Sequence, residues 1–139
     1  MQHYLEQEFD YNDENLVSAY DELPLWSSPF GLLLLEKIRF RPNIIALDVG
    51  CGTGFPLLEL SQRFGSSCRF YGIDCWERAV KRIKRKIETY GLKNVSVVHG
   101  DAADMPFEND YFDLVVSNLG INNYIDFEKV LNELYRVTK

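Results

Sequence analysis

ALDVGCGTGFP, residues 46–56, carries the strongest signal for the fold of this chain. The apolar run that enters it predicts a buried strand, which ends at Asp48 and Val49. Three glycines follow at alternate positions, Gly50, Gly52 and Gly54. Glycines allow a tight turn and let a ligand approach the backbone closely, and Pro56 suits the first turn of a helix. We therefore expect a strand, a ligand-binding turn, and a helix whose N-terminal N–H groups suit an anion.

Outward from this stretch, short apolar runs alternate with segments of helical periodicity. The apolar runs predict strands over residues 44–49, 68–73, 94–99 and 112–117. The helical spacing predicts helices over residues 13–23, 32–40, 55–64, 76–90 and 126–138, with Asp13 as an N-cap and Pro24 as the end of the first helix. Such alternation indicates an α/β fold with a parallel sheet, whose ligands bind beyond the carboxyl ends of the strands.

Acidic residues follow the second and third expected strands. In FYGIDCWERAV, residues 70–80, Asp74 lies 24 residues after Gly50, close to the roughly 20 that separate a glycine turn from a ribose-binding acid. Asp74 could also cap the next helix, and the two roles are compatible. In VVHGDAADMPFENDYFD, residues 97–113, Asp101 and Ala102 follow the third strand. Taken by itself, Asp101 could cap a turn.

The acid and three alternating glycines of residues 48–54 resemble the first motif of the class I S-adenosylmethionine-dependent methyltransferases. Dinucleotide-binding turns differ, because their glycines are spaced G-x-G-x-x-G. The resemblance implies a Rossmann-like doubly wound sheet with the order 3-2-1-4, preceded by N-terminal helices. It also implies S-adenosylmethionine as cofactor and S-adenosylhomocysteine as product. Asp74 would then bind the ribose, Asp101 would accept from the adenine amino group, and the N–H of Ala102 would meet a ring nitrogen.

The remaining candidates for the cofactor site lie around these motifs. Asn118 follows the fourth strand, beside the methionine half of the cofactor in this topology, and Tyr20 is the best candidate to cover it, although core packing is equally open to Tyr20. The expected cofactor set is Asp48, Gly50, Cys51, Gly52, Gly54, Asp74, Cys75, Asp101, Ala102, Asn118 and Tyr20. No catalytic base can be named, and none is required unless the acceptor must lose a proton.

The segment VVSNLGINNY, residues 115–124, bears on the methyl acceptor. It lacks the Asn-Pro-Pro-Tyr sequence that amino-group methyltransferases of nucleic acids carry at this place. The resemblance therefore favours a small-molecule acceptor, as in the ubiquinone-biosynthesis-like members. A cofactor-binding module without activity is the main alternative. A nicotinamide dehydrogenase is disfavoured by the glycine spacing, and aminopropyl transfer stays open.

Composition excludes several other classes. Residues 1–35 hold seven acids and no Lys or Arg, which does not suit phosphate binding, so we expect no nucleic-acid partner. This acidic segment is either a solvated helix or a cover that repels anions. The basic run KRIKRKIE, residues 81–88, is expected to be a solvated outer helix. Three cysteines without framework spacing predict neither disulfides nor a metal site, and the absence of a signal peptide or membrane span predicts a cytoplasmic protein.

The resemblance also bears on domain organisation. Residues 1–42 are expected to form an N-terminal helical cap segment, and residues 43–139 the cofactor-binding domain. LNELYRVTK, residues 131–139, matches the helix before the fifth of seven strands in the family, so we expect the C-terminal strands to be absent. The chain would be a fragment, or a short form that completes its sheet with a partner. An exposed apolar edge at residues 112–116 would favour a homodimer or aggregation.

Overall fold

The computed structural model describes residues 9–23 and 27–139. Four strands form one parallel sheet in the order β3-β2-β1-β4, as expected. The strands are β1 (Ile45–Val49), β2 (Arg69–Asp74), β3 (Val95–His99) and β4 (Leu114–Val116). The α-helices are α1 (Glu14–Glu22), α2 (Ser28–Lys37), α3 (Leu57–Phe64), α4 (Glu77–Tyr90) and α5 (Phe127–Val137), and η3 (Ile121–Asn123) is a short 3₁₀ turn.

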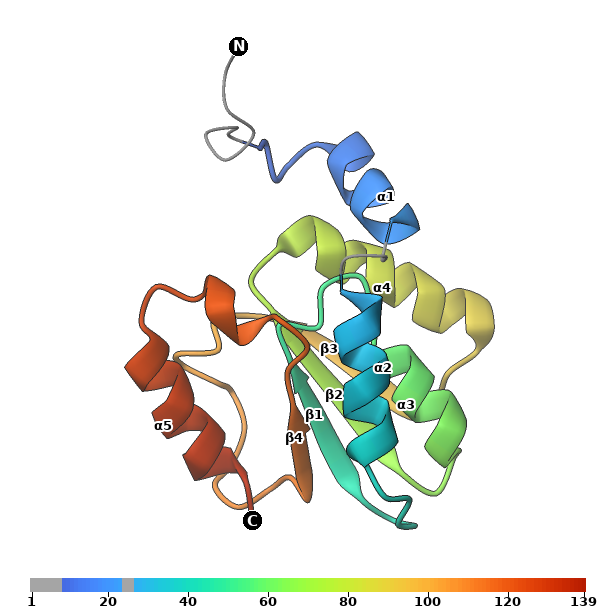
Figure 1. Ribbon diagram of the computed structural model, residues 1–139, viewed down its shortest axis with the longest axis vertical. Helices are drawn as coiled ribbons and strands as arrows, with labels where there is room; N and C mark the ends of the chain where they lie inside the picture. Colours follow the sequence, from blue (N-terminus) through green and yellow to red (C-terminus); the bar gives the residue numbers. More distant parts are fainter. Residues whose placement is uncertain (1–8, 24–26) are drawn as a thin grey trace.

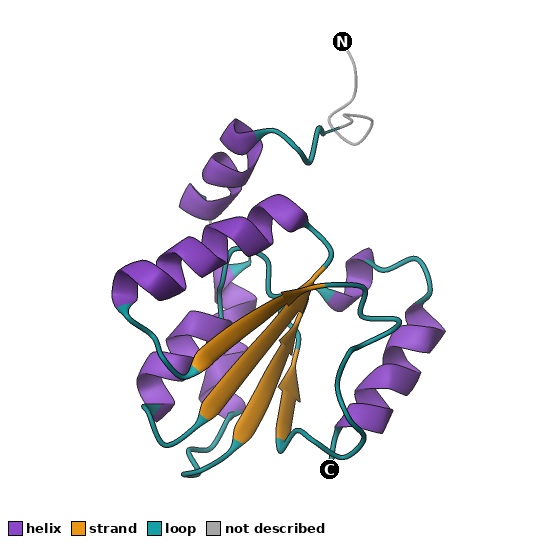
Figure 2. Cartoon of the chain, turned by 180° about the vertical axis from the view of Figure 1, so that it is seen from behind, coloured by secondary structure: helices purple, strands orange, loops and turns teal. Residues whose placement is uncertain are grey.

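The helices cover the sheet in two layers (Figures 1 and 2). Alternate residues of a strand point to opposite faces, so Ala46 of β1 packs with α2, α3 and α4, whereas Leu47 and Val49 pack with α5. Each face has its own apolar core, and the strands are buried on both sides as parallel strands require. The carboxyl ends of the strands therefore meet at one edge, where the loops gather.

Sequence signals placed several element ends correctly. Asp13 caps α1 through its side chain, which accepts a hydrogen bond from the Asn15 N–H. Gly91 ends α4 in the left-handed conformation, with φ of 62°. Pro24, the expected end of the first helix, lies outside the described residues.

Helix α2 and strand β4 depart from the expected ranges. Helix α2 begins at Ser28 rather than at Leu32, because Pro29 stands in its first turn, where the missing N–H of a proline does no harm. Strand β4 is limited to Leu114–Val116, and Phe112 instead pairs in parallel with Thr138. The C-terminal end of α5 is thereby tied back to the start of β4.

The acidic helix α1 lies across the basic helix α4. Glu14 pairs with Arg78, and Asp21 pairs with both Arg82 and Lys86. Burial raises the pKa of Asp21, but hydrogen bonds from Lys86 and Arg82 outweigh burial, and the net pKa is lowered. The expected solvated surface of α4 is therefore partly an interface with α1.

Candidate functional site

The glycine turn between β1 and α3 has the left-handed backbone that glycines permit. Gly50, Gly52 and Gly54 all have positive φ, of 72°, 50° and 118°. A side chain on Gly50 would also collide with the backbone, because its Cβ would lie 2.6 Å from the Cα of Gly120. Gly52 differs, since a Cβ there would meet only Tyr20 at 3.7 Å. The turn is thus packed closely behind Gly50 and open beside Gly52.

Asp74, at the end of β2, fixes this turn. Its Oδ2 accepts the N–H of Gly52 at 2.7 Å, and its Oδ1 accepts the N–H of Trp76 at 2.8 Å. The side chain is almost buried, and this burial raises its pKa despite both hydrogen bonds. Each carboxylate oxygen has a second lone pair. Asp74 can therefore hold the turn and still accept hydroxyl groups from a ligand.

Asp48, at the end of β1, is fully buried and lacks such support. Neither of its carboxylate oxygens has a hydrogen-bond partner in the described part of the chain. Burial, and then the charge of Asp74, raise the pKa of Asp48 to about 8. The backbone N–H of Leu57 lowers this pKa in part, but it does not form a hydrogen bond with either carboxylate oxygen. Because an unpaired buried charge is costly, Asp48 is protonated at neutral pH unless a cation comes close.

The third acid, Asp101, follows β3 and is exposed. Its Oδ1 accepts the N–H of Ala103 at 2.9 Å, so the carboxylate is held within a turn, while Ala102 is fully buried. The Gly100 N–H donates to the Asp74 carbonyl, and His99 Nε2 lies 3.0 Å from the carbonyl oxygen of Cys75. These contacts join the ends of β2 and β3, with Cys75 exposed at the junction.

The turn after β4 lies against the glycine turn. Ser117 Oγ donates to the Val49 carbonyl at 2.6 Å and accepts the N–H of Ile121 at 3.0 Å. The Asn118 amide donates to the carbonyl of Ser27, at the start of α2, at 3.3 Å. The structure thus brings the start of α2 and the turn after β4 together with the ends of β1 and β2. Asn118 contacts the helical segment at this junction.

Helix α1 places Tyr20 beside the glycine turn, where the Tyr20 ring contacts the ring of Trp76. The rings of Tyr20 and Trp76 meet edge to face, 5.3 Å apart. Burial, and then the charge of Asp74, raise the pKa of Tyr20, and Trp76 Nε1 donates to the carbonyl of Tyr11 at 2.7 Å. The predicted cover residue is therefore close to Asp74. It contributes a hydroxyl that stays protonated.

Sequence reasoning missed Tyr124, which follows η3. Its ring packs against the core shared by β1 and β2, and burial, followed by the charge of Asp74, raises its pKa strongly. Cys75, Cys51 and Asp101 add to this effect, so its hydroxyl lies within electrostatic reach of three expected site residues besides Asp74. Tyr124 closes the run VVSNLGINNY, but no spacing in that run marks the tyrosine.

Together, Asp48, Asp74 and Asp101 place three carboxyl groups around an open backbone turn. The carboxylates of Asp74 and Asp101 attract cationic ligands and repel a pyrophosphate, and a cation that comes close would also favour ionisation of Asp48. It suits a molecule with an ammonium and a sulfonium group better than a dinucleotide. Among the described residues, no group of three or more His, Cys, Asp or Glu side chains could hold a metal ion, and no helix is long and apolar enough to cross a membrane.

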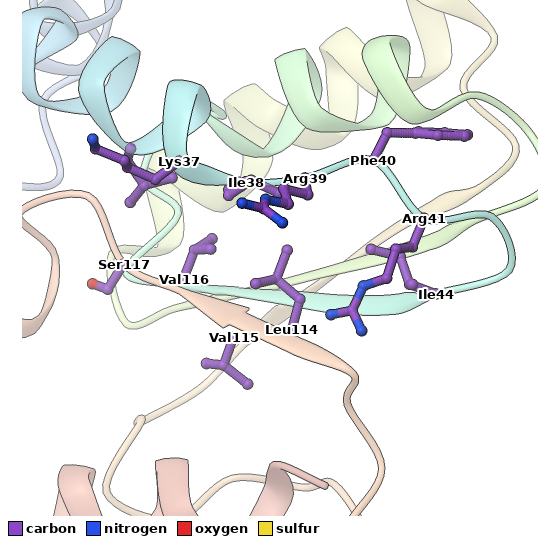
Figure 3. A pocket seen from close by; sticks show the side chains of 11 residues that line it. Lys37, Ile38, Arg39, Phe40, Arg41, Ile44, Leu114, Val115, Val116 and Ser117 are labelled. Atoms are coloured by element: carbon purple, nitrogen blue, oxygen red, sulfur yellow. The ribbon is translucent and has the colours of Figure 1, made fainter.

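A separate groove of about 890 Å³ runs along β4 (Figure 3), and none of the three acids at the strand ends lines it. Its floor includes Leu114 and Val116, and three cations line it, Lys37, Arg39 and Arg41. Ser117 is the only member of the groove lining that also belongs to the turn after β4. The groove is therefore a feature of the sheet edge, and none of the expected cofactor residues lines it.

Comparison with known proteins assigns the chain to a family. Residues 40–139 match the methyltransferase domain family model. The chain is 39% identical over 131 residues to the demethylmenaquinone methyltransferase of Geobacillus stearothermophilus, covering 91% of this chain and 56% of that protein. It is 34% identical to the enzyme of the same name from Staphylococcus aureus, covering 93% and 51%. The chain thus spans about half the length of these curated relatives.

Solved structures agree with this assignment. An S-adenosylmethionine-dependent methyltransferase from Aquifex aeolicus is similar with a TM-score of 0.79 and 28% identity, covering 95% of this chain and 69% of that one. A Methanococcus maripaludis protein, described as an S-adenosylmethionine-dependent methyltransferase, shares the fold with a TM-score of 0.78 at 22% identity, covering 100% and 63%. The chain therefore belongs to the methyltransferase domain family, among its class I S-adenosylmethionine-dependent members.

Proposed function

We propose that this chain binds S-adenosylmethionine across the carboxyl ends of β1, β2 and β3 and serves methyl transfer to a small-molecule acceptor. The observation that carries the proposal is the pairing of an open glycine turn with three carboxyl groups, one of which is buried and has no hydrogen-bond partner among the described residues. S-adenosylmethionine supplies a methyl group already activated on a sulfonium. The chain has to bind, orient and shield its ligands, which can provide most of the acceleration.

Each proposed cofactor residue has a chemical role that its position supports. Asp74 accepts the ribose hydroxyls with the lone pairs that the turn does not use, and Asp101 with the Ala102 N–H recognises the adenine. Asp48 provides a carboxylate for a ligand ammonium. Gly50, Gly52, Cys75 and Asn118 line the backbone path between these groups, and Tyr20 covers it. Cys51 and Gly54 are buried and shape the turn from the core side.

The acceptor, the assembly and the location of the protein are finer proposals. The names of the curated relatives make demethylmenaquinone the first acceptor to test. Residues 1–42 act as the cap segment and residues 43–139 as the cofactor-binding domain, although Leu35 of α2 already packs into the sheet core. We further propose a cytoplasmic protein that pairs into a homodimer through the apolar edge of β4. Size-exclusion chromatography with light scattering tests the dimer, and a monomer at high concentration would refute it.

Thermal unfolding with added ligands tests cofactor binding. A ligand at about 100 times its dissociation constant stabilises the native state by roughly 2.7 kcal/mol. We expect S-adenosylmethionine and S-adenosylhomocysteine, but not NAD, to raise the melting temperature of the chain. Asp74→Ala should abolish the shift, whereas Glu88→Gln, an exposed charge on α4, should retain it. The proposal would be overturned if only NAD raised the melting temperature, or if none of the three ligands raised it.

The alternative is a module that binds the cofactor without transferring its methyl group. It is favoured by one observation, namely that the chain spans about half the length of its curated relatives. Release of labelled methyl to demethylmenaquinone separates the two functions. Binding without transfer would leave the module as the function of this chain.

A further inference from the structure

We infer that Arg136 and Glu133 of α5 form a latch that positions the adenine-recognition loop, residues 100–113. This inference rests on the proposed function, because it concerns how Asp101 is held for its ligand. Both residues lie on the last turns of α5 and approach the loop from outside the proposed cofactor site. They are positioning residues, since neither side chain is hydrogen-bonded to a proposed cofactor residue in the described part of the chain.

The latch consists of hydrogen bonds to alternate positions of the loop, residues 105, 107 and 109. The guanidinium of Arg136 donates to the carbonyls of Phe107 at 2.7 Å and Met105 at 3.0 Å, and to Asn109 Oδ1 at 2.9 Å. Glu133 Oε2 accepts the N–H of Met105 at 2.6 Å. The loop contains neither helix nor named strand, so these contacts replace the regular ladder that would otherwise fix its backbone.

The two side chains also orient each other. Arg136 Nε donates to Glu133 Oε1 at 2.6 Å, and its second amino group donates to Oε2 at 2.7 Å. This bidentate pairing holds the guanidinium in one plane. The hydrogen bond from Arg136 lowers the pKa of Glu133, and that pairing raises the pKa of Arg136. Only an arginine presents enough donors for Glu133 and three loop oxygens together.

The latch reaches Asp101 through a short stretch of backbone. Asp101 is exposed, and its Oδ1 accepts the Ala103 N–H while its carbonyl accepts the Asp104 N–H. Met105 follows this turn directly and is held at both its N–H and its carbonyl by the latch. Ala102 and Met105 are buried in the α5 core, which fixes the depth of the loop. The latch fixes the course of the backbone that leaves the turn, and so the direction of the Asp101 carboxylate.

A double-mutant cycle on ligand affinity tests the inference. We expect Arg136→Gln to weaken S-adenosylhomocysteine binding by about five- to tenfold in the natural chain, but by less than about twofold in an Asp101→Ala background. S-inosylhomocysteine lacks the adenine amino group, so its affinity should respond little to Arg136→Gln. Arg136→Lys keeps the charge but not the planar fork and should restore part of the lost affinity.

Controls separate positioning from general stability. Arg63→Gln removes a similar 2.7 Å pair with Glu59 on the surface of α3 and should leave both affinities unchanged. Glu133→Gln is the milder variant if Arg136→Gln fails to fold, and it should show the same dependence on Asp101. Equal losses for both ligands, or an undiminished loss in Asp101→Ala, would overturn the latch. Failure of the natural chain to bind S-adenosylhomocysteine would instead overturn the proposed function and the latch with it.

Discussion

The ends of β1 and β2 each carry an aspartate, but the two side chains differ in their hydrogen bonding. Asp48 and Asp74 are both buried at neighbouring strand ends. Asp74 accepts two backbone N–H groups, whereas Asp48 has no hydrogen-bond partner in the described chain. Hydrogen bonds to the charged form favour ionisation, and burial alone opposes it. The carboxylate of Asp74 therefore holds the glycine turn, whereas that of Asp48 is left without a partner among the described residues, which is consistent with its proposed role toward a ligand ammonium.

Removing the partnered acid should have the largest effect on the fold. Asp74→Ala leaves the Gly52 and Trp76 N–H groups without their acceptor, and unsatisfied buried donors cost about 1–3 kcal/mol each. We expect the free energy of unfolding to fall by about 2–4 kcal/mol, measured by urea denaturation. Asp74→Asn retains one carbonyl acceptor and should lose less. A loss below about 0.5 kcal/mol for Asp74→Ala, within the range of surface substitutions, would contradict the role of Asp74 in holding the glycine turn.

Removing the unpartnered acid should change the pH dependence of stability. Unfolded Asp48 ionises near pH 3.9, but the pKa of the folded carboxyl is raised to about 8. Between about pH 4 and 8 the folded state therefore holds a proton on Asp48 that the unfolded state has lost. The contribution of this proton to the free energy of unfolding is complete below about pH 4 and is lost as the pH rises toward 8.

Asp48→Asn should abolish that slope, which cannot exceed about 1.4 kcal/mol per pH unit. Urea denaturation from pH 5 to 8, with and without the substitution, isolates the contribution of Asp48 from other titrating groups. Saturating S-adenosylhomocysteine, which carries an ammonium group, should flatten the slope of the natural chain. Parallel pH profiles for the two proteins would mean that Asp48 has an ordinary pKa.

The smallest expected effect concerns helix α1, which lies across α4. Asp21→Asn removes the charge that pairs with Arg82 and Lys86, and partly exposed pairs contribute about 0.2–1 kcal/mol each. We expect a small loss of stability that added salt makes smaller, since exposed charges are screened. Asp10→Asn, which removes an exposed acid, is the matched control. A loss that persists unchanged in high salt would contradict an ionic contact.

The sequence predicted most features that depend on neighbours along the chain, although the start of α2 was expected four residues too late. The Asp13 cap, the glycine turn, the strand order and the acids at the strand ends all follow from local spacing or from the resemblance that this spacing supports. Contacts between distant segments were not predictable in the same way. The acids of α1 and the bases of α4 each fit a solvated surface when taken alone, and only the fold brings them together.

The same limit applies to the site. No local pattern links Arg136 to Met105, or Tyr124 to Asp74, because these pairs are joined through the sheet and the turn after β4. Asp48 was predicted as a cofactor residue from its place before the glycines. Its lack of partners depends on how α3 and β2 close around it, which a sequence pattern does not encode.

The contact between Gly50 and Gly120 has a kinetic consequence. The glycine turn follows β1, but Gly120, which packs against it, follows β4 and lies 70 residues further along the chain than Gly50. Non-local pairings of this kind form slowly. One edge of β1 is paired only after β4 has formed, and the glycine turn is fully packed only after Gly120 is in place. We therefore expect the cofactor site to be among the last parts to assemble, so that ligand binding during refolding would report completion of the whole sheet.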